Sequence, residues 1–216
     1  MKAIESCGIV LPKKIQAAVE SRKKDFLFGR YCAYRASELL LGQSDARFLK
    51  IEQAEDGGPQ WPKGFTGSIT HTAGYAAAIL ARETDFRSIG IDSQAWMTSE
   101  GASKLEKKIL TLDEINWIEE GKSPFPRGWN KLNQVTFAFA AKESLYKCLR
   151  PLTHTFFGLQ SAEVIKVSTS DQEGRGSFEI RLRSDLGEPT VFKTSEVFEG
   201  TFQVTAHWIH TEILLK

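Results

Sequence analysis

The sequence predicts an α+β fold made of two similar halves. In each half a helical segment is followed by strands, once in residues 1–97 and again in residues 98–216. Apolar residues at three- and four-residue intervals mark the helices, alternation marks the strands, and clusters of Gly and charged residues separate them. We therefore expect two halves with pseudo-twofold symmetry that meet at a central cleft. Each should carry a helix packed on a small, mostly antiparallel sheet.

Composition and charge exclude several classes of partner. A formal net charge of +1 over 216 residues argues against a nucleic acid, so any basic site must be local. Cys7, Cys32 and Cys148 lack CxxC spacing, which disfavours a disulfide framework or a zinc site and favours a reducing compartment. Neither a membrane-spanning apolar run nor the apolar core of a signal peptide is present. We expect a cytoplasmic monomer that binds neither nucleic acid nor membrane.

Residues 12–41 have a helical pattern that begins near Pro12 and stops at Gly42. Arg22 and Arg30 are a little over two turns apart, so they project from similar sides of this helix. They are either part of a solvated basic face or an anion site, because guanidinium groups match a phosphate monoester.

The segment 60–72, QWPKGFTGSITHT, is predicted to be a loop that leads into a short strand at 68–72. Lys63, Thr70 and His71, with neighbouring hydroxyls, supply several donors suited to phosphate oxygens. A lone histidine more often makes a structural hydrogen bond, and that alternative stays open here.

Residues 75–81 and 87–94 read as two strands of an antiparallel hairpin. Side chains alternate across a strand, so Asp92 and Gln94 share a face. Asp is depleted in strands, so Asp92 either caps the following segment or ligates a metal.

Two short helices are predicted in 98–121, the second opening with a capping box of Thr111 and Glu114. A long helix follows over 130–150, closed by Pro151. The remaining strands are expected at 158–167, 176–183, 191–193 and 200–210.

The long helix carries the chain's most informative stretch, FAFAAKESLYKCL at 137–149. Its small and apolar residues form one buried stripe, which comprises Ala138, Ala141, Leu145, Cys148 and Leu149. Glu143 and Lys147 fall on the other side, one turn apart. Alone they are an exposed ion pair; with a second carboxylate nearby they would hold a divalent metal and a phosphate.

Four segments occur in a fixed order: GR at 29–30, WPKGxxGSITH at 61–71, GIDxQ at 90–94 and KESLYK at 142–147. Together they resemble the 4′-phosphopantetheinyl transferases, in particular the single-chain, two-halved type that serves surfactin, enterobactin and related biosynthetic systems. The resemblance runs from about Arg22 to Lys147, and no motif covers the last third of the chain.

The resemblance implies transfer of the 4′-phosphopantetheine group from coenzyme A to a serine of an apo acyl, peptidyl or aryl carrier protein. It also implies release of 3′,5′-ADP and an active site in the cleft between the halves. Asp92 and Glu143 match the magnesium-ligating carboxylates, with Mn²⁺ as an alternative ion, and Lys147 matches the lysine on the diphosphate. The positions matching contacts to the nucleotide and its phosphates are Arg22, Arg30, Lys63, Thr70 and His71.

In this reaction the serine oxygen attacks the β-phosphate, and Mg²⁺, Lys147 and His71 offset the charge that grows on the ADP side. Either Glu143 or a metal-bound water takes the serine proton. We expect the charged loop and helices at 104–127 to dock the carrier protein, although an ordinary solvated surface is the alternative. The residues of this surface are Lys104, Lys107, Lys108, Lys122 and Arg127, set among Trp117 and Phe125.

The sequence departs from the family pattern at two positions. Gln94 replaces the usual second acidic residue of the GxDxE motif, so we expect it beside the metal as a weak or indirect ligand. Phe139 replaces the usual Trp. Two other classes of function are alternatives to the transferase. A non-catalytic coenzyme A or nucleotide-binding module would not need Asp92 and Glu143, and a thiol enzyme is disfavoured because Cys148 lies on the apolar stripe.

Overall fold

The computed structural model describes residues 7–46, 50–54, 57–72, 74–170 and 174–216. The chain divides into two compact units, Met1–Ile89 with Lys216, and Gly90–Leu215. The division falls within strand β5 (Ser88–Ala95), whereas the sequence pattern predicts a boundary after residue 97. No helix in the described ranges is long and apolar enough to cross a membrane.

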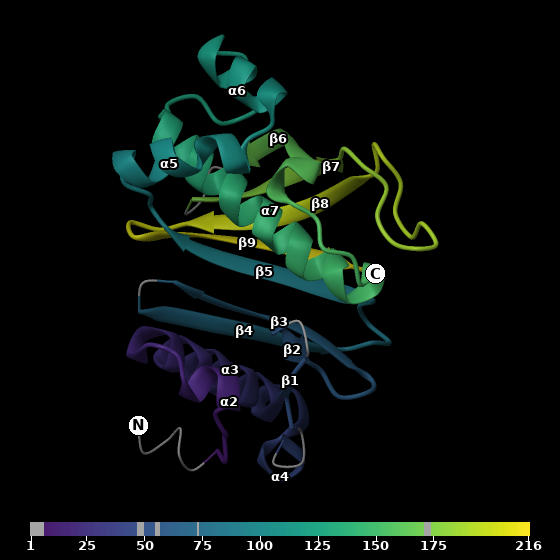
Figure 1. The fold of residues 1–216 in the computed structure, drawn as a ribbon. Helices are drawn as coiled ribbons and strands as arrows, with labels where there is room; N and C mark the ends of the chain where they lie inside the picture. Colours follow the sequence, from purple (N-terminus) through teal and green to yellow (C-terminus); the bar gives the residue numbers. More distant parts are fainter. Residues whose placement is uncertain (1–6, 47–49, 55–56, 73, 171–173) are drawn as a thin grey trace. The chain divides into compact units, whose positions relative to one another are not determined.

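The first unit has helices on a two-stranded hairpin (Figure 1). Its helices are α2 (Lys13–Gln16), α3 (Glu20–Leu41) and α4 (Gln43–Ala46). Its strands are β1 (Glu52–Gln53), β2 (Pro59–Gln60), β3 (Phe65–Thr72) and β4 (Tyr75–Arg82). The expected single helix over 12–41 is therefore broken, because Val19 has an extended backbone (φ −64°, ψ 154°). Gly42 ends α3 with φ 83°, as predicted.

The strand pairing in this region differs from the predicted hairpin. β4 pairs antiparallel with β3, from Phe65 opposite Arg82 to Thr72 opposite Tyr75. β5 joins a separate five-stranded sheet beside β9 (Trp208–Leu215). The prediction of a hairpin between 75–81 and 87–94 was wrong, because β4 pairs with β3 and β5 takes a place beside β9 in the other sheet.

The second unit packs helices on this sheet, whose strand order is β5-β9-β8-β7-β6. The other strands are β6 (Ala162–Thr169), β7 (Arg175–Leu182) and β8 (Val197–Val204). The helices are α5 (Ser99–Ile109), α6 (Leu112–Glu119), α7 (Lys131–Thr153) and the short 3₁₀ turn η1 (Leu159–Ser161). Mixed helices and antiparallel sheets confirm the predicted α+β class.

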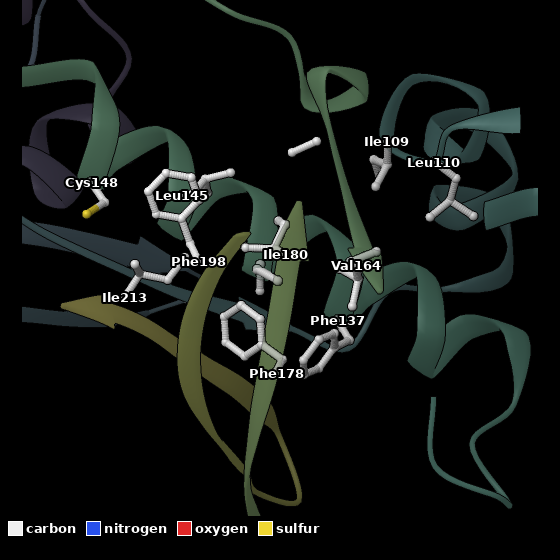
Figure 2. Packing of buried hydrophobic residues seen from close by; sticks show 14 of the residues in the cluster. Ile109, Leu110, Phe137, Leu145, Cys148, Val164, Phe178, Ile180, Phe198 and Ile213 are labelled. Carbon is white, nitrogen blue, oxygen red and sulfur yellow. The ribbon is translucent and has the colours of Figure 1, made fainter. Parts of the chain in front are cut away.

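The core of the second unit lies between α7 and the sheet. Figure 2 shows Leu145 and Cys148 of α7 among Phe178, Ile180 and other apolar residues of the strands. All five residues of the predicted stripe are fully buried. Burial of this stripe holds α7 on the sheet, since each buried aliphatic or aromatic side chain contributes roughly 1.5–3 kcal/mol.

The ends of several elements differ from their predicted positions. α7 continues through Pro151 to Thr153, past its predicted end at residue 150. The expected strand at 200–210 is two strands, β8 and β9. Between them the Thr205 hydroxyl accepts the amide of Trp208 at 2.9 Å and closes a turn. The expected short strand at 191–193 is reduced to one isolated bridge between Leu186 and Phe192.

Candidate active site

Helix α7 and strand β5 bring Asp92 and Lys147 into contact. Lys147 Nζ donates to Asp92 Oδ1 at 2.6 Å and to the carbonyl of Ile91 at 3.1 Å. Asp92 is 6% exposed, and the side chain of Lys147 is 26% exposed. The pair is thus buried at its anionic end and open to solvent at its cationic end.

Glu143 lies one turn before Lys147 and is half-buried. Burial raises the pKa of its carboxyl, the positive charge of Lys147 lowers it, and the negative charge of Asp92 raises it again. Its carboxylate makes no hydrogen bond or ion pair with any residue that the structure describes. Two carboxylates and an ammonium group therefore act on one another here.

This donor set suits a hard divalent cation better than a transition metal. Mg²⁺ is held by one or two carboxylates together with substrate phosphates and water, and Asp92 and Glu143 supply two carboxylates. Within the described ranges, no group of three or more His, Cys, Asp or Glu residues could hold a metal ion. The residues present thus fit Mg²⁺ only as an ion that shares its coordination with a substrate.

Gly90 allows β5 to lie against α7. A Cβ at this position would overlap the carbonyl oxygen of Ser144 and lie 2.6 Å from the amide nitrogen of Cys148. Only a residue without a side chain therefore permits this approach, which brings Asp92 within reach of Lys147 two residues further along β5.

Gln94 lies on β5, two residues after Asp92. Its Nε2 donates to the carbonyl of Ala95 at 3.3 Å, which leaves the amide oxygen as the atom that an ion would use. His210 of β9 is a neighbour that no sequence pattern predicts, because Ser93 lies 117 residues before it in the chain. Its Nδ1 lies 2.8 Å from Ser93 Oγ; burial lowers its pKa, and the charge of Asp92 opposes that effect.

The first unit brings Arg22 and His71 together. Arg22 Nη1 lies 3.1 Å from His71 Nε2, and His71 Nδ1 lies 3.8 Å from Asp25 Oδ2. Arg22 and His71 are both exposed. Helix α3 and strand β3 thus present a cation and an imidazole on one surface of this unit.

Arg30 is the most unusual cation of the first unit, because it is only 7% exposed. Its guanidinium lies 5.1 Å from the centre of the Phe26 ring, and Nη1 is buried without a hydrogen-bond partner among the described residues. Burial lowers its pKa to about 10. Gly29 lets α3 approach β3 here, since a Cβ would lie 2.8 Å from Ile69 Cγ2. A buried donor without a partner is costly, so this site favours an anionic ligand.

The other two residues predicted near the nucleotide differ in exposure. Lys63 is exposed in the turn before β3, where it has free access to solvent, whereas Thr70 is 1% exposed within β3. Thr70 is therefore built into the hairpin.

The predicted docking surface at 104–127 is only partly as expected. Lys107 and Lys108 are exposed in the last turn of α5, but Lys104 and Lys122 are paired with Glu100 and Glu120, respectively. Phe125 was wrongly placed on this surface. It is 7% exposed and packs edge-on against Phe137, so it belongs to the core.

Two family models match the chain. The 4′-phosphopantetheinyl transferase N-terminal domain matches residues 11–81, and the 4′-phosphopantetheinyl transferase superfamily model matches residues 88–203. The second match covers more than half of the chain and includes Asp92, Glu143 and Lys147.

Curated relatives agree with these matches. The chain is 32% identical over 208 residues to the 4′-phosphopantetheinyl transferase Npt of Nocardia iowensis, which covers 92% of this chain and 85% of the relative. It is 34% identical over 172 residues to the 4′-phosphopantetheinyl transferase PptT of Mycobacterium tuberculosis. This match covers 79% of this chain and 70% of the relative. It is 31% identical over 162 residues to enterobactin synthase component D of Salmonella typhimurium. This match covers 73% of this chain and 60% of the relative. The chain therefore belongs to the 4′-phosphopantetheinyl transferase superfamily and is an enzyme of that kind.

Proposed function

We propose that Asp92, Glu143 and Lys147 form the Mg²⁺ and diphosphate centre at which this enzyme transfers 4′-phosphopantetheine from coenzyme A to a carrier-protein serine. The observation that carries the proposal is the group of two carboxylates and one ammonium on β5 and α7, with the Asp92–Lys147 contact at 2.6 Å. A bound Mg²⁺ would supply positive charge to the phosphate oxygens. Asp92 and Glu143 would hold it, and Gln94 is the candidate for a weak or indirect third ligand.

The chain's own residues have distinct tasks in this reaction. A new bond forms between the serine oxygen and the β-phosphorus, and the bond to the departing 3′,5′-ADP breaks. The Lys147 side chain is partly exposed to solvent, so a bound diphosphate can reach its ammonium group. There the ammonium offsets the negative charge on the diphosphate. Glu143 or a water molecule is proposed to accept the serine proton.

Residues of the first unit are proposed to bind the phosphates of the nucleotide. The buried Nη1 of Arg30 supports this role, since a phosphate would satisfy it. Three exposed side chains add further donors: Arg22 on α3, His71 on β3 and Lys63 in the turn before β3. His71 is also proposed to offset the charge on the departing ADP. Thr70 is also proposed to bind a phosphate. Its side chain is buried, so the phosphate must approach the hydroxyl along one face of β3.

A transfer assay tests the proposed function. The protein is incubated with fluorescent coenzyme A, Mg²⁺ and a panel of apo carrier proteins from acyl, peptidyl and aryl systems. We expect label on at least one carrier, release of 3′,5′-ADP in equal amount, and loss of both on addition of EDTA. Transfer that is unaffected by EDTA would contradict the proposed metal centre.

Arg30→Met should weaken coenzyme A binding more than binding of 3′-dephospho-coenzyme A. Met keeps the buried apolar stem but removes the fork that pairs with the 3′-phosphate, which should cost about 10- to 100-fold in Kd for coenzyme A only. Titration calorimetry with both ligands measures the difference. Equal losses for the two ligands would place Arg30 away from the 3′-phosphate.

Gln94→Glu should lower the Mg²⁺ concentration at half-maximal rate, because it adds a negative charge on the face of β5 that carries Asp92. It should also slow product release from the more tightly held site. Gln43→Glu, at an exposed position of α4, makes the same chemical change outside the centre and should leave the metal dependence unchanged. A metal dependence that Gln94→Glu does not move would show that this side chain does not act on the ion.

Reversing the charges of Lys107 and Lys108 should raise the KM for the carrier protein and leave that for coenzyme A unchanged. Both ammonium groups are exposed, and an acidic carrier would meet them through long-range attraction that salt screens above about 0.15 M. The control is Lys13→Glu/Lys14→Glu, which reverses the same number of exposed charges at the first two positions of α2. Equal changes in carrier KM for the two double variants at low salt would exclude a specific role for this surface.

A further inference from the structure

The two neighbours of Glu143 in the chain are buried polar residues. Lys142 is 1% exposed and Ser144 is 0% exposed, whereas Glu143 is half-buried. Successive residues of an α-helix point about 100° apart, so Lys142 and Ser144 extend to either side of Glu143. The rest of this face is apolar, as Leu145 and Cys148 show in Figure 2. The burial of Lys142 and Ser144 in an otherwise apolar interface therefore needs a specific explanation.

Lys142 forms an ion pair that no apolar core needs. Its Nζ donates to Glu114 Oε2 at 2.5 Å and to the carbonyl of Ile109 at 2.7 Å. Both charged side chains are essentially covered, at 1% and 0% exposed. Removing two charges from water costs more than packing apolar groups of the same size, so stability alone does not account for the pair.

Glu114 uses both of its carboxylate oxygens. Oε2 also accepts the amide of Thr111 at 2.7 Å, and Oε1 accepts the amide of Val164 at 2.9 Å. This one side chain therefore connects the start of α6, strand β6 and helix α7. Directional bonds from three elements leave Lys142 little freedom to shift along or around its helix axis.

Ser144 supplies the second anchor. Its Oγ lies 2.5 Å from Thr211 Oγ1 and 3.1 Å from the carbonyl oxygens of both Ala140 and Thr211. Thr211 belongs to β9, on a different part of the sheet from Val164 of β6. Contacts in two directions fix the rotation of α7 about its own axis, and Glu143 is the residue between them.

We propose that Glu114 and Lys142 are a positioning pair for the transfer reaction. The pair holds α7 in the rotation that turns Glu143 toward Asp92, with Ser144 and Thr211 as the opposite anchor. Neither Glu114 nor Lys142 touches the reacting atoms. This inference rests on the proposed function, because the role of Glu143 is itself a proposal.

The test compares Glu114→Gln with Glu163→Gln. Glu163 is an equally suitable carboxylate for comparison, since it is 3% exposed and paired with Arg181 and Arg183. Glu163 makes no hydrogen bond to α7, although its charge also acts on Lys142, so Glu163→Gln removes a neighbouring charge and keeps the directional bond between Glu114 and Lys142. Both variants should lower Tm, because Lys142 loses its ionic partner in Glu114→Gln and Arg181 loses its ionic partner in Glu163→Gln. Measured well below both transitions, kcat should fall by roughly 10- to 100-fold only in Glu114→Gln.

A double variant separates positioning from stability. Glu114→Gln/Lys142→Met removes both charges, so Tm should recover relative to Glu114→Gln, while kcat should stay low because Met makes no directional bond. Mn²⁺ affinity in the presence of coenzyme A, measured by electron paramagnetic resonance, provides a readout besides activity. It should weaken in Glu114→Gln and in the double variant, and stay unchanged in Glu163→Gln. If Glu114→Gln does not fold, the double variant alone carries the comparison.

Two results would overturn the proposal: equal kcat in Glu114→Gln and Glu163→Gln, or recovery of kcat together with Tm in the double variant. Failure of the proposed function is distinguishable from both. Full transfer by Glu143→Gln would remove the role assigned to Glu143, whatever the Glu114 variants do.

Discussion

Asp92→Asn and Glu143→Gln should each lower the rate of carrier modification by at least about 10²- to 10³-fold. Each change removes one negative charge from the centre and keeps the shape of the side chain. In Asp92→Asn the Lys147 ammonium also loses its ionic partner at 2.6 Å. The rate is measured at millimolar Mg²⁺ with a carrier that the parent protein modifies.

A matched control and a fold measurement accompany these variants. Glu119→Gln, at an exposed position of α6, makes the same chemical change outside the centre. It lies within the proposed docking surface at 104–127, so its rate is measured at saturating carrier, where it should be unchanged. Far-ultraviolet circular dichroism and Tm should show that all three variants fold. Near-normal turnover by Asp92→Asn or Glu143→Gln would exclude that residue from the metal centre.

Gly90→Ala should both destabilise the second unit and remove most of the activity. The added methyl group would overlap the Ser144 carbonyl and crowd Cys148, so α7 must move away from β5. Overpacking of this kind costs about 1–3 kcal/mol. The same movement separates Lys147 from Asp92, so the rate should fall even at temperatures where the variant is folded. Chemical denaturation and the transfer assay measure the two effects.

Gly158→Ala is the control for this prediction. Gly158 belongs to the same unit, has an ordinary φ of −79°, and has open space where a Cβ would lie. It should therefore change neither the free energy of unfolding nor the rate appreciably. If Gly90→Ala is as stable and as active as Gly158→Ala, the close approach of β5 to α7 is not required for the site.

The features that the sequence predicted correctly depend on local patterns. The apolar stripe of α7 follows from residue spacing, and the Thr111–Glu114 capping box from residue types three positions apart; both are present in the structure. Asp92 was singled out because a carboxylate is unusual in a strand, and it lies beside Lys147. Each of these signals is contained in a few consecutive residues.

The features that the sequence did not predict depend on distant partners. The choice of β3 rather than β5 as the partner of β4 is decided by tertiary pairing, which alternation within a strand does not specify. Phe125 has the flanking sequence of a surface loop, but it fills a place beside Phe137 in the core. Nothing in the sequence around Lys142 distinguishes a buried ion pair from an exposed lysine, because Glu114 is 28 residues away in the chain.

The metal centre on β5 and α7 is tested most directly by Mn²⁺ binding in the presence of coenzyme A. Electron paramagnetic resonance measures the free ion in titrations of the parent protein, Asp92→Asn, Glu143→Gln and the control Glu119→Gln. We expect one bound ion whose affinity rises with coenzyme A, kept in Glu119→Gln and lost in both centre variants. Unchanged Mn²⁺ affinity in Asp92→Asn and Glu143→Gln would contradict the assignment of these carboxylates as the ligands.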